Sequence, residues 1–118
     1  MKTGVSMFSF TEDADLRHLF PLVKQAGYDG VEPVLSENGY LNQNTSEREI
    51  LEIKKMAQDT GLEIPSVGVW SLWENNLVSN DPSIRQKAED IIKKQIECAA
   101  LMGADTILAV SYTHLRAH

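Results

Sequence analysis

Residues 25–32 read Gln25-Ala26-Gly27-Tyr28-Asp29-Gly30-Val31-Glu32, and residues 59–64 and 101–108 repeat the same order of residue types. In each stretch a glycine follows a run with helical periodicity, an acidic residue comes two positions later, and residues that favour β-strands follow. Glycine readily takes the left-handed conformation that ends a helix. A continuous apolar run is typical of a strand buried in a parallel sheet. The repeat therefore predicts three places where a helix ends and a strand begins.

The segment before the first repeat has the pattern of an amphipathic helix over about residues 13–26. Thr11 is its candidate N-cap. Pro21 should kink the helix or begin a new first turn, because proline lacks the backbone N–H. The side chains expected to face the core are Leu16, Leu19, Phe20 and Val23.

Two further helices are predicted from their start signals. Ser46 has the spacing to Glu49 of a capping box, and Asp81 followed by Pro82 is typical of an N-cap and a first helical position. The apolar residues expected on their buried faces are Ile50, Ile53 and Ala57 in the earlier helix, and Ile84, Ala88, Ile91, Ile92, Ile96 and Ala99 in the later one.

Four strands are predicted, over about residues 3–8, 30–34, 63–69 and 106–110. Strands that alternate with helices imply a parallel sheet with right-handed crossovers. An open doubly wound sheet and a barrel both fit this order. The first turn, residues 9–13, has no glycine-rich phosphate fingerprint, which argues against a nucleotide-binding fold without proving a barrel.

The composition excludes several classes of protein. The formal net charge is −6 and the pI is near 4.9, whereas proteins that bind nucleic acid usually present a basic surface. No stretch reaches the length of a membrane span, and residues 1–10 make a poor signal peptide. Cys98, the only cysteine, is predicted to be a thiol in the core. A cytoplasmic location is expected.

Five stretches, residues 2–6, 26–32, 62–68, 79–85 and 103–108, taken in order resemble the xylose-isomerase-like TIM barrels known as sugar phosphate isomerases and epimerases. Ser71-Leu72-Trp73-Glu74-Asn75 is more similar to the branch of hexulose-6-phosphate isomerase and L-ribulose-5-phosphate 3-epimerase. The resemblance implies an α/β fold in which residues 1–109 are the N-terminal half of a (β/α)8 barrel. A complete barrel of this type has ~250 residues.

The last nine residues, 110–118, do not resemble the family. They resemble the conceptual translation of a sequencing adapter, and we expect them to be a non-native tail. His114 and His118 lie in this tail with a spacing of four residues. No metal site is expected there, because no carboxylate accompanies them.

The resemblance implies that the chain is a fragment of a sugar or sugar phosphate isomerase or epimerase that acts on ketoses. In the family, a divalent metal (Mn, Mg, Co or Zn) assists proton transfer through an enediolate. The catalytic residues and metal ligands would lie on strands beyond the end of this chain, so neither catalysis nor bound metal is expected of the fragment alone. The parent would be an enzyme of carbohydrate metabolism, with its oligomeric state left open.

Five residues are predicted to line the substrate pocket because barrel active sites lie at the carboxyl ends of the strands. They are Ser6, Phe8, Glu32, Gly68 and Trp70. Glu32 is interpreted either as a hydrogen-bond partner of the substrate or as a carboxylate paired for structure. Trp70 is interpreted either as part of a substrate-covering loop or as an aromatic packed beneath that loop.

Other functions remain open at this point. The same scaffold carries inosose dehydratases and abasic-site endonucleases, and the acidic charge argues against the endonuclease. A non-catalytic module that binds sugars is a third possibility. In every case the expected ligand is a small sugar or sugar phosphate, and neither nucleic acid nor membrane is an expected partner.

Overall fold

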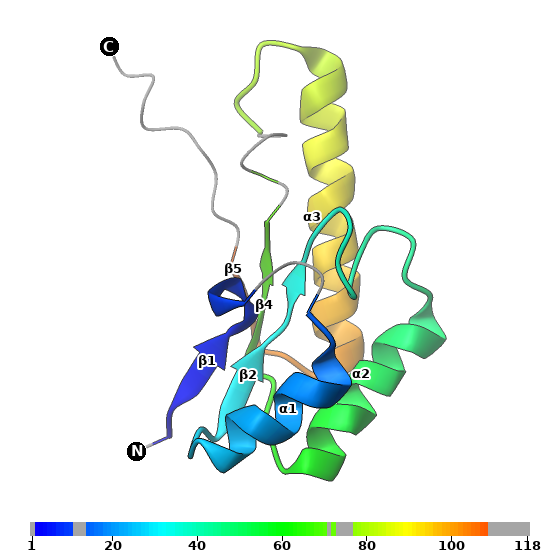
Figure 1. The fold of residues 1–118 in the computed structure, drawn as a ribbon. Coiled ribbons are helices and arrows are strands. Elements are labelled where there is room, and N and C mark those ends of the chain that lie inside the picture. Colours follow the sequence, from blue (N-terminus) through cyan, green and yellow to red (C-terminus); the bar gives the residue numbers. More distant parts are fainter. Residues whose placement is uncertain (1, 11–13, 71, 73–76, 109–118) are drawn as a thin grey trace, which may run out of the picture.

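Parallel strands alternate with helices along the chain, as Figure 1 shows for a computed structural model that describes residues 2–10, 14–70, 72 and 77–108. The strands are β1 (Gly4–Ser6), β2 (Gly30–Glu32), β3 (Val34–Leu35), β4 (Ser66–Val69) and β5 (Thr106–Leu108); the helices are α1 (Leu16–Gln25), α2 (Glu47–Thr60) and α3 (Pro82–Met102), with a short 3-10 helix, η1, at Met7–Ser9. The predicted alternation is confirmed. The strands are shorter than predicted.

All the pairings are parallel: β1 with β2, β3 with β4, and β4 with β5. β2 also reaches the segment before β4, because Val31 N–H donates to the Glu63 carbonyl at 2.9 Å. The sheet order is therefore β1, then β2 with β3, then β4, then β5. β1 and β5 each pair with one neighbour within the described residues.

Two prolines interrupt the pairing between the strands that were predicted over residues 30–34 and 63–69. Gly30 lies opposite Glu63, yet Val34 lies opposite Gly68, so the register shifts by one residue. Pro33 and Pro65 lie between these points, one on each strand. Neither has an N–H to donate to a ladder, which accounts for the break between β2 and β3.

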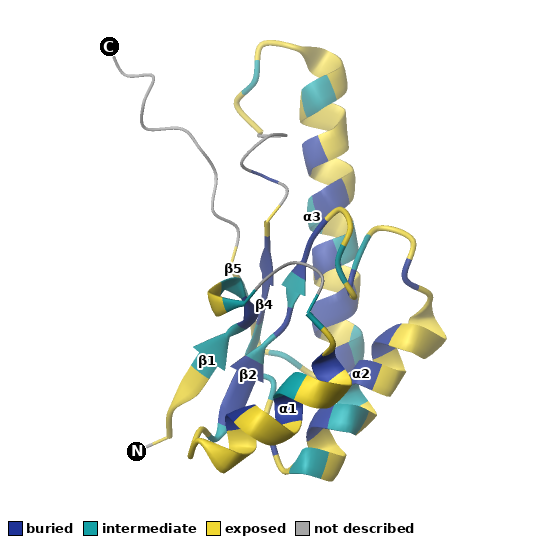
Figure 2. Ribbon diagram, viewed as in Figure 1, coloured by how far each residue is buried: buried dark blue, intermediate teal, exposed yellow. Residues whose placement is uncertain are grey.

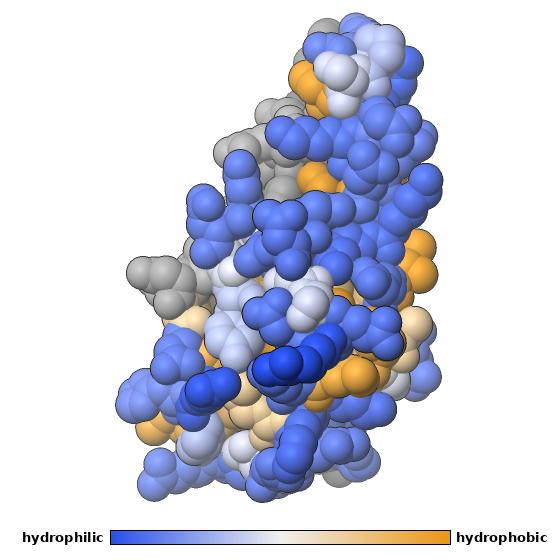
Figure 3. Space-filling view, turned by 90° about the vertical axis from the view of Figure 1, so that its right-hand side faces the viewer, coloured by the Kyte–Doolittle hydropathy of each residue, from blue (hydrophilic) through white to orange (hydrophobic). Residues whose placement is uncertain are grey.

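The helices cover one face of the sheet, and the core lies between the two layers. Val31, Val67 and Val69 point into it and are fully buried. Figure 2 shows buried residues on the strands and on the inner sides of the helices. Figure 3 shows the side of the molecule that α2 and α3 occupy, where the surface is largely hydrophilic. None of the helices in the described residues has the length and apolarity needed to cross a membrane.

The first helix begins later than predicted. Its N-cap is Asp15, whose side chain accepts from the Arg17 N–H; Thr11 lies outside the described residues. Pro21 lies inside α1 rather than at a new start. The predicted inward face is confirmed, with Leu16, Phe20 and Val23 buried and Leu19 packed against them.

The caps of the other two helices are as predicted. Ser46 and Glu49 form a reciprocal capping box, and Asp81 caps α3 with Pro82 in its first turn. Both helices end at a glycine in the left-handed region, Gly61 with φ 81° and Gly103 with φ 75°. The repeat thus marks these helix ends because other residues are strained at such φ values.

The predicted buried face of α3 is only partly confirmed, because Ile84 is only half-buried and lies outside the core. Ile96 is 52% exposed, while its neighbour Gln95 is fully buried. The buried face follows a spacing of three and four residues and comprises Ala88, Ile91, Gln95, Cys98, Ala99 and Met102. Choosing the buried residue by polarity alone selects Ile96, whereas the helical spacing of the buried face places Gln95 inside.

Candidate functional site

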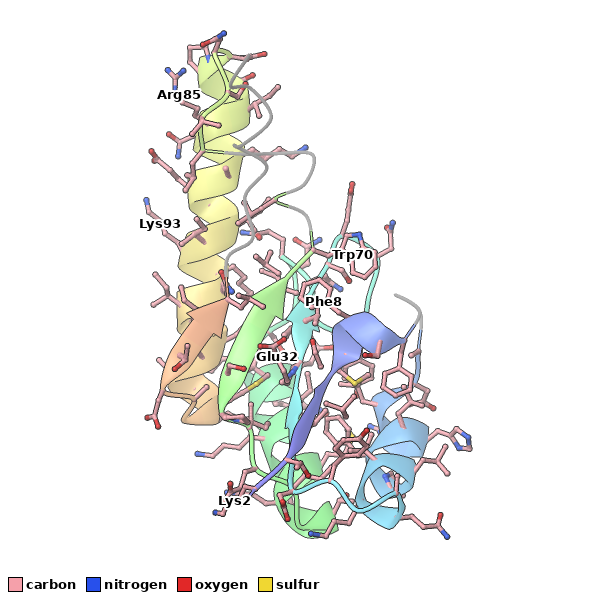
Figure 4. All side chains as sticks on the ribbon, turned by 90° about the vertical axis from the view of Figure 1, so that its left-hand side faces the viewer. Lys2, Phe8, Glu32, Trp70, Arg85 and Lys93 are labelled. Carbon is pink, nitrogen blue, oxygen red and sulfur yellow. The ribbon has the colours of Figure 1, made fainter. Side chains whose placement is uncertain are left out.

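A polar and aromatic cluster lies on the face of the sheet opposite the helices. Side chains alternate between the faces of a strand, so Ser66, Gly68 and Trp70 oppose the buried Val67 and Val69. Figure 4 shows Glu32, Phe8 and Trp70 along this open face, with the helices behind the sheet. The open face of a half-barrel corresponds to the interior of the closed barrel.

Glu32 lies at the centre of the cluster, held by serines from both neighbouring strands. Ser6 donates to its Oε1 and Ser66 donates to its Oε2, each at 2.6 Å. The same Ser6 hydroxyl caps η1 by accepting from the Phe8 N–H at 3.2 Å. One carboxylate therefore ties β1, β2 and β4 together and fixes the turn that carries Phe8.

Gly68 allows the aromatic part of the cluster to form. A Cβ atom at this position would lie 2.9 Å from Phe8 Cε2 and 3.2 Å from Glu32 Oε1. With no side chain there, the Phe8 ring rests over the strand and meets Trp70, with ring centroids 5.4 Å apart. This distance lies in the favourable range for aromatic pairs. Trp70 remains 43% exposed.

A small apolar hollow adjoins the aromatic pair. Its volume is about 30 Å³, roughly the space of one water molecule. Its lining includes Met7, Phe10, Val34, Tyr40, Leu41 and Trp70. The hollow is too small for a sugar, so a sugar in contact with this cluster would lie on the open face.

The five predicted pocket residues are brought together: Ser6, Phe8, Glu32, Gly68 and Trp70 all take part in the contacts above. Ser66 was missed, although its place two residues before Gly68 puts it on the same face. Leu72 is buried, whereas Trp73, Glu74 and Asn75 lie outside the described residues.

Gln95 is a second residue that the sequence did not reveal, and it acts from the helix side of the sheet. Its Nε2 donates to the carbonyls of Val67 at 2.8 Å and Leu108 at 2.9 Å. Its Oε1 is buried and has no partner among the described residues. The amide therefore fastens β4 and β5 to α3. Nearby Cys98 is buried, and desolvation raises the pKa of its thiol to about 11, as predicted for a core cysteine.

The described residues do not fit a divalent metal. No group of three or more His, Cys, Asp or Glu side chains gathers within the described ranges. In the cluster itself Glu32, which accepts the Ser6 and Ser66 hydroxyls, is the only carboxylate among the described residues. Hard cations need several oxygen ligands at once, so no metal-dependent step is assigned to these residues.

Comparison with known proteins agrees with the parallel half-barrel. A family model described as xylose isomerase-like TIM barrel matches residues 20–117. Searches among curated proteins find no significant match. The matched range is most of the chain and reaches into residues 110–118, so the prediction of a non-native tail there stays untested.

Three solved structures share the fold. The 3-keto-D-glucoside 4-epimerase of E. coli has a TM-score of 0.66 and 20% identity over 91% of this chain. The D-allulose 3-epimerase of Methylomonas sp., solved with D-allulose, has a TM-score of 0.65 and 18% identity over 93% of this chain. A protein of Anabaena variabilis, provisionally named a sugar phosphate isomerase/epimerase, has a TM-score of 0.60 and 20% identity over 91% of this chain.

In each case the match covers 36% of the solved chain, so this chain spans about a third of their length. At these identities the likeness shows the fold alone. Together with the family model over residues 20–117, it establishes that the chain belongs to the xylose isomerase-like TIM barrel family.

Proposed function

We propose that this chain is the N-terminal part of a sugar isomerase or epimerase that acts on ketoses, and that the cluster around Glu32 is one wall of its substrate pocket. The observation that carries the proposal is the pairing of a fixed carboxylate with an exposed aromatic face at the carboxyl ends of parallel strands. Family membership and the position of barrel active sites support it.

In this proposal the aromatic pair supplies the apolar contact. Sugars present C–H groups on one side of the ring or chain and hydroxyls along the edge. The exposed Trp70 ring, supported by Phe8 at 5.4 Å, offers a flat surface for the C–H side. Such a ring combines a large apolar area with a defined orientation.

Glu32 would supply the polar contact. A carboxylate oxygen has about two acceptor sites, and each oxygen of Glu32 uses one of them for a serine hydroxyl. One site on each oxygen is left for a sugar hydroxyl. Because Ser6 and Ser66 hold the carboxylate in place, little side-chain entropy is lost when it binds.

The proton transfer belongs to residues outside this chain. The metal-assisted transfer through an enediolate that the resemblance implies would be supplied by the remaining strands of the parent protein. This wall would bind and orient the ketose and help to exclude water. The chain alone is expected to bind weakly and to leave the sugar unchanged.

A binding experiment on the chain tests the proposal. Saturation-transfer NMR with D-allulose should show transfer to sugar protons, and the intrinsic fluorescence of a Trp73→Phe variant, which retains only Trp70, should change on titration. Trp70→Ala should abolish the transfer, whereas the matched change of an exposed apolar residue on α2, Leu51→Ala, should leave it intact. Absence of transfer at tens of millimolar sugar would refute the proposal.

A second experiment tests the activity of the parent. A protein that joins this chain to the remaining barrel strands should interconvert ketose epimers or aldose–ketose pairs, with activity lost on chelation and restored by a divalent metal. A parent that turns over inososes, and not ketoses, would assign the dehydratase function instead.

A further inference from the structure

The Ser6 hydroxyl links the polar part of the cluster to its aromatic part. It donates to Oε1 of Glu32 at 2.6 Å and accepts from the Phe8 N–H at 3.2 Å. A serine hydroxyl has one donor and two acceptor sites, so it can make both bonds at the same time. Any change in how Glu32 is bonded therefore reaches the backbone of η1 through a single oxygen atom.

The Ser6 cap holds the turn that carries the Phe8 ring. η1 is a single turn of three residues, in which the Phe10 N–H donates to the Met7 carbonyl at 3.1 Å and the Phe8 N–H donates to Ser6. Figure 4 shows the Phe8 ring beside Trp70. Because the two ring centroids lie 5.4 Å apart, the orientation of the aromatic pair depends on the cap.

The two bonds of the Ser6 hydroxyl strengthen each other. A hydroxyl that donates to a charged carboxylate becomes more polarised, and its oxygen is then a better acceptor for a second donor. The charge of Glu32 thus strengthens the bond from the Phe8 N–H. The state of the carboxylate and the position of the aromatic ring are therefore coupled, and the coupling runs through Ser6.

Ser66 offers an internal comparison for this role. It donates to the other oxygen of Glu32 at the same distance of 2.6 Å, and both serines are half-buried. Ser66 lies on β4, whereas Ser6 is the N-cap of η1. Removing either hydroxyl takes one bond from the carboxylate, but the change at Ser6 also takes the cap from the turn that carries Phe8.

We propose that Ser6 is a positioning residue that couples the polar contact of the cluster to its aromatic contact, so that a ketose meets Glu32 and Trp70 in the correct relative orientation. The inference rests on the proposed function, because it concerns the sugar bound by the same cluster. It goes beyond that function by assigning the alignment of the two contacts to one hydroxyl group.

Measurements on the free chain test the coupling without any sugar. Ser6→Ala should accelerate hydrogen exchange of the Phe8 N–H about ten-fold, as expected for the loss of one hydrogen bond. It should also shift the emission of Trp70 in the Trp73→Phe background. Ser6→Thr, which keeps the hydroxyl, should restore both signals. Ser66→Ala should change them much less, and Ser9→Ala, at an exposed position in the same turn, should leave them unchanged.

A further variant keeps the test decisive if Ser6→Ala does not fold. Glu32→Gln retains both serines but removes the charge that polarises the Ser6 hydroxyl. The amide proton signal of Phe8 should move in this variant, because its acceptor is weakened. A Phe8 signal that stays in place in Glu32→Gln would overturn the coupling.

Titrations with D-allulose test the consequence for binding. The dissociation constant should rise about five-fold in Ser6→Ala and about two-fold in Ser66→Ala, because the first change disturbs two contacts and the second only one. Ser6→Thr should bind as the unaltered chain does. Saturation-transfer NMR and the emission of Trp70 in the Trp73→Phe background give the two measurements.

The outcomes separate the coupling from the proposed function. If the unaltered chain binds D-allulose and the two serine-to-alanine changes weaken binding equally, Ser6 has only a structural role and the coupling is overturned, while the sugar-binding function stands. If the unaltered chain does not bind the sugar, the proposed function fails and the positioning role fails with it. Failure of Ser6→Thr to restore the signals of Phe8 and Trp70 would also overturn the coupling.

Discussion

Ser66 donates a 2.6 Å hydrogen bond to Oε2 of Glu32, and this bond joins β4 to β2 next to the place where two prolines interrupt their ladder. It is a side-chain bridge where the backbone pairing is weak. Ser6 makes the matching bond from β1. Glu32 therefore has a structural role whatever it binds, and both interpretations made from the sequence are compatible with its position.

The first prediction concerns this bridge. Ser66→Ala should lower the free energy of unfolding by about 1.5–3 kcal/mol, the usual range for a hydrogen bond to a charged group. Urea denaturation followed by circular dichroism measures the change. Ser9→Ala is the control, because Ser9 is exposed. A loss no larger than that of the control would show that the bridge contributes nothing to stability.

The second prediction concerns the close approach at Gly68. Gly68→Ala should displace the Phe8 ring, since the new Cβ would lie 2.9 Å from Phe8 Cε2, and should cost about 1–3 kcal/mol as overpacking does. The emission of Trp70 in the Trp73→Phe background should shift as the ring pair separates. The double variant Phe8→Leu with Gly68→Ala should lose less free energy of unfolding than the two single variants lose together. If the two losses in the free energy of unfolding simply add, position 68 and the Phe8 ring are not in contact.

The third prediction concerns Gln95. Gln95→Leu leaves the carbonyl of the buried Val67 and the carbonyl of Leu108 without their donor, and it should lower the free energy of unfolding by about 1–3 kcal/mol. Hydrogen exchange should accelerate at β5 before it does at β1. Ile96→Gln, one position away on the exposed side, should change stability by about 0.5 kcal/mol or less. Equal effects of the two changes would mean that α3 is turned differently.

The fourth prediction uses the single thiol. Because burial raises the pKa of Cys98 to about 11, the folded chain should react with a disulfide reagent at pH 8 far more slowly than the chain in denaturant. The pKa of the thiol is higher in the folded state than in the unfolded state. The stability that the buried neutral thiol gives the folded chain is therefore fully present below about pH 8.5 and is lost as the pH rises towards 11. Ser9→Cys in a Cys98→Ala background provides the exposed comparison. Rapid labelling of native Cys98 would contradict its burial.

The fifth prediction concerns the outer strands. β1 and β5 each have one partner among the described residues, and open strand edges promote association. Sedimentation velocity should show association that increases with concentration. Leu108→Lys, at a residue 43% exposed on β5, should reduce it. A concentration-independent monomer with a sharp thermal transition would contradict the prediction.

The sequence predicted the elements well wherever local chemistry decides them. The capping box at Ser46, the Asp81–Pro82 start and the left-handed glycines at 61 and 103 are short-range signals, and all are confirmed. The start of α1 was wrong because two polar residues, Thr11 and Asp15, compete for the same cap. Local propensity alone does not decide between them.

The candidate site was predicted from strand ends and not from contacts. Placing Ser6, Glu32 and Gly68 at the carboxyl ends of parallel strands brings them together whatever the exact register. Ser66 and Gln95 were missed because their roles depend on the register shift and on the rotation of α3. Strand alternation from Gly68 and the helical spacing of the α3 face would have placed both residues, but neither pattern gives the partners that their side chains bond.

The interruption at Pro33 and Pro65 also separates the sheet into a base and a rim. Before the two prolines, β1 and β2 pair with each other through their backbones. After them, β3 pairs with β4 in a shifted register. Changes that reshape the upper strands to suit another ligand would not have to propagate into the lower ones.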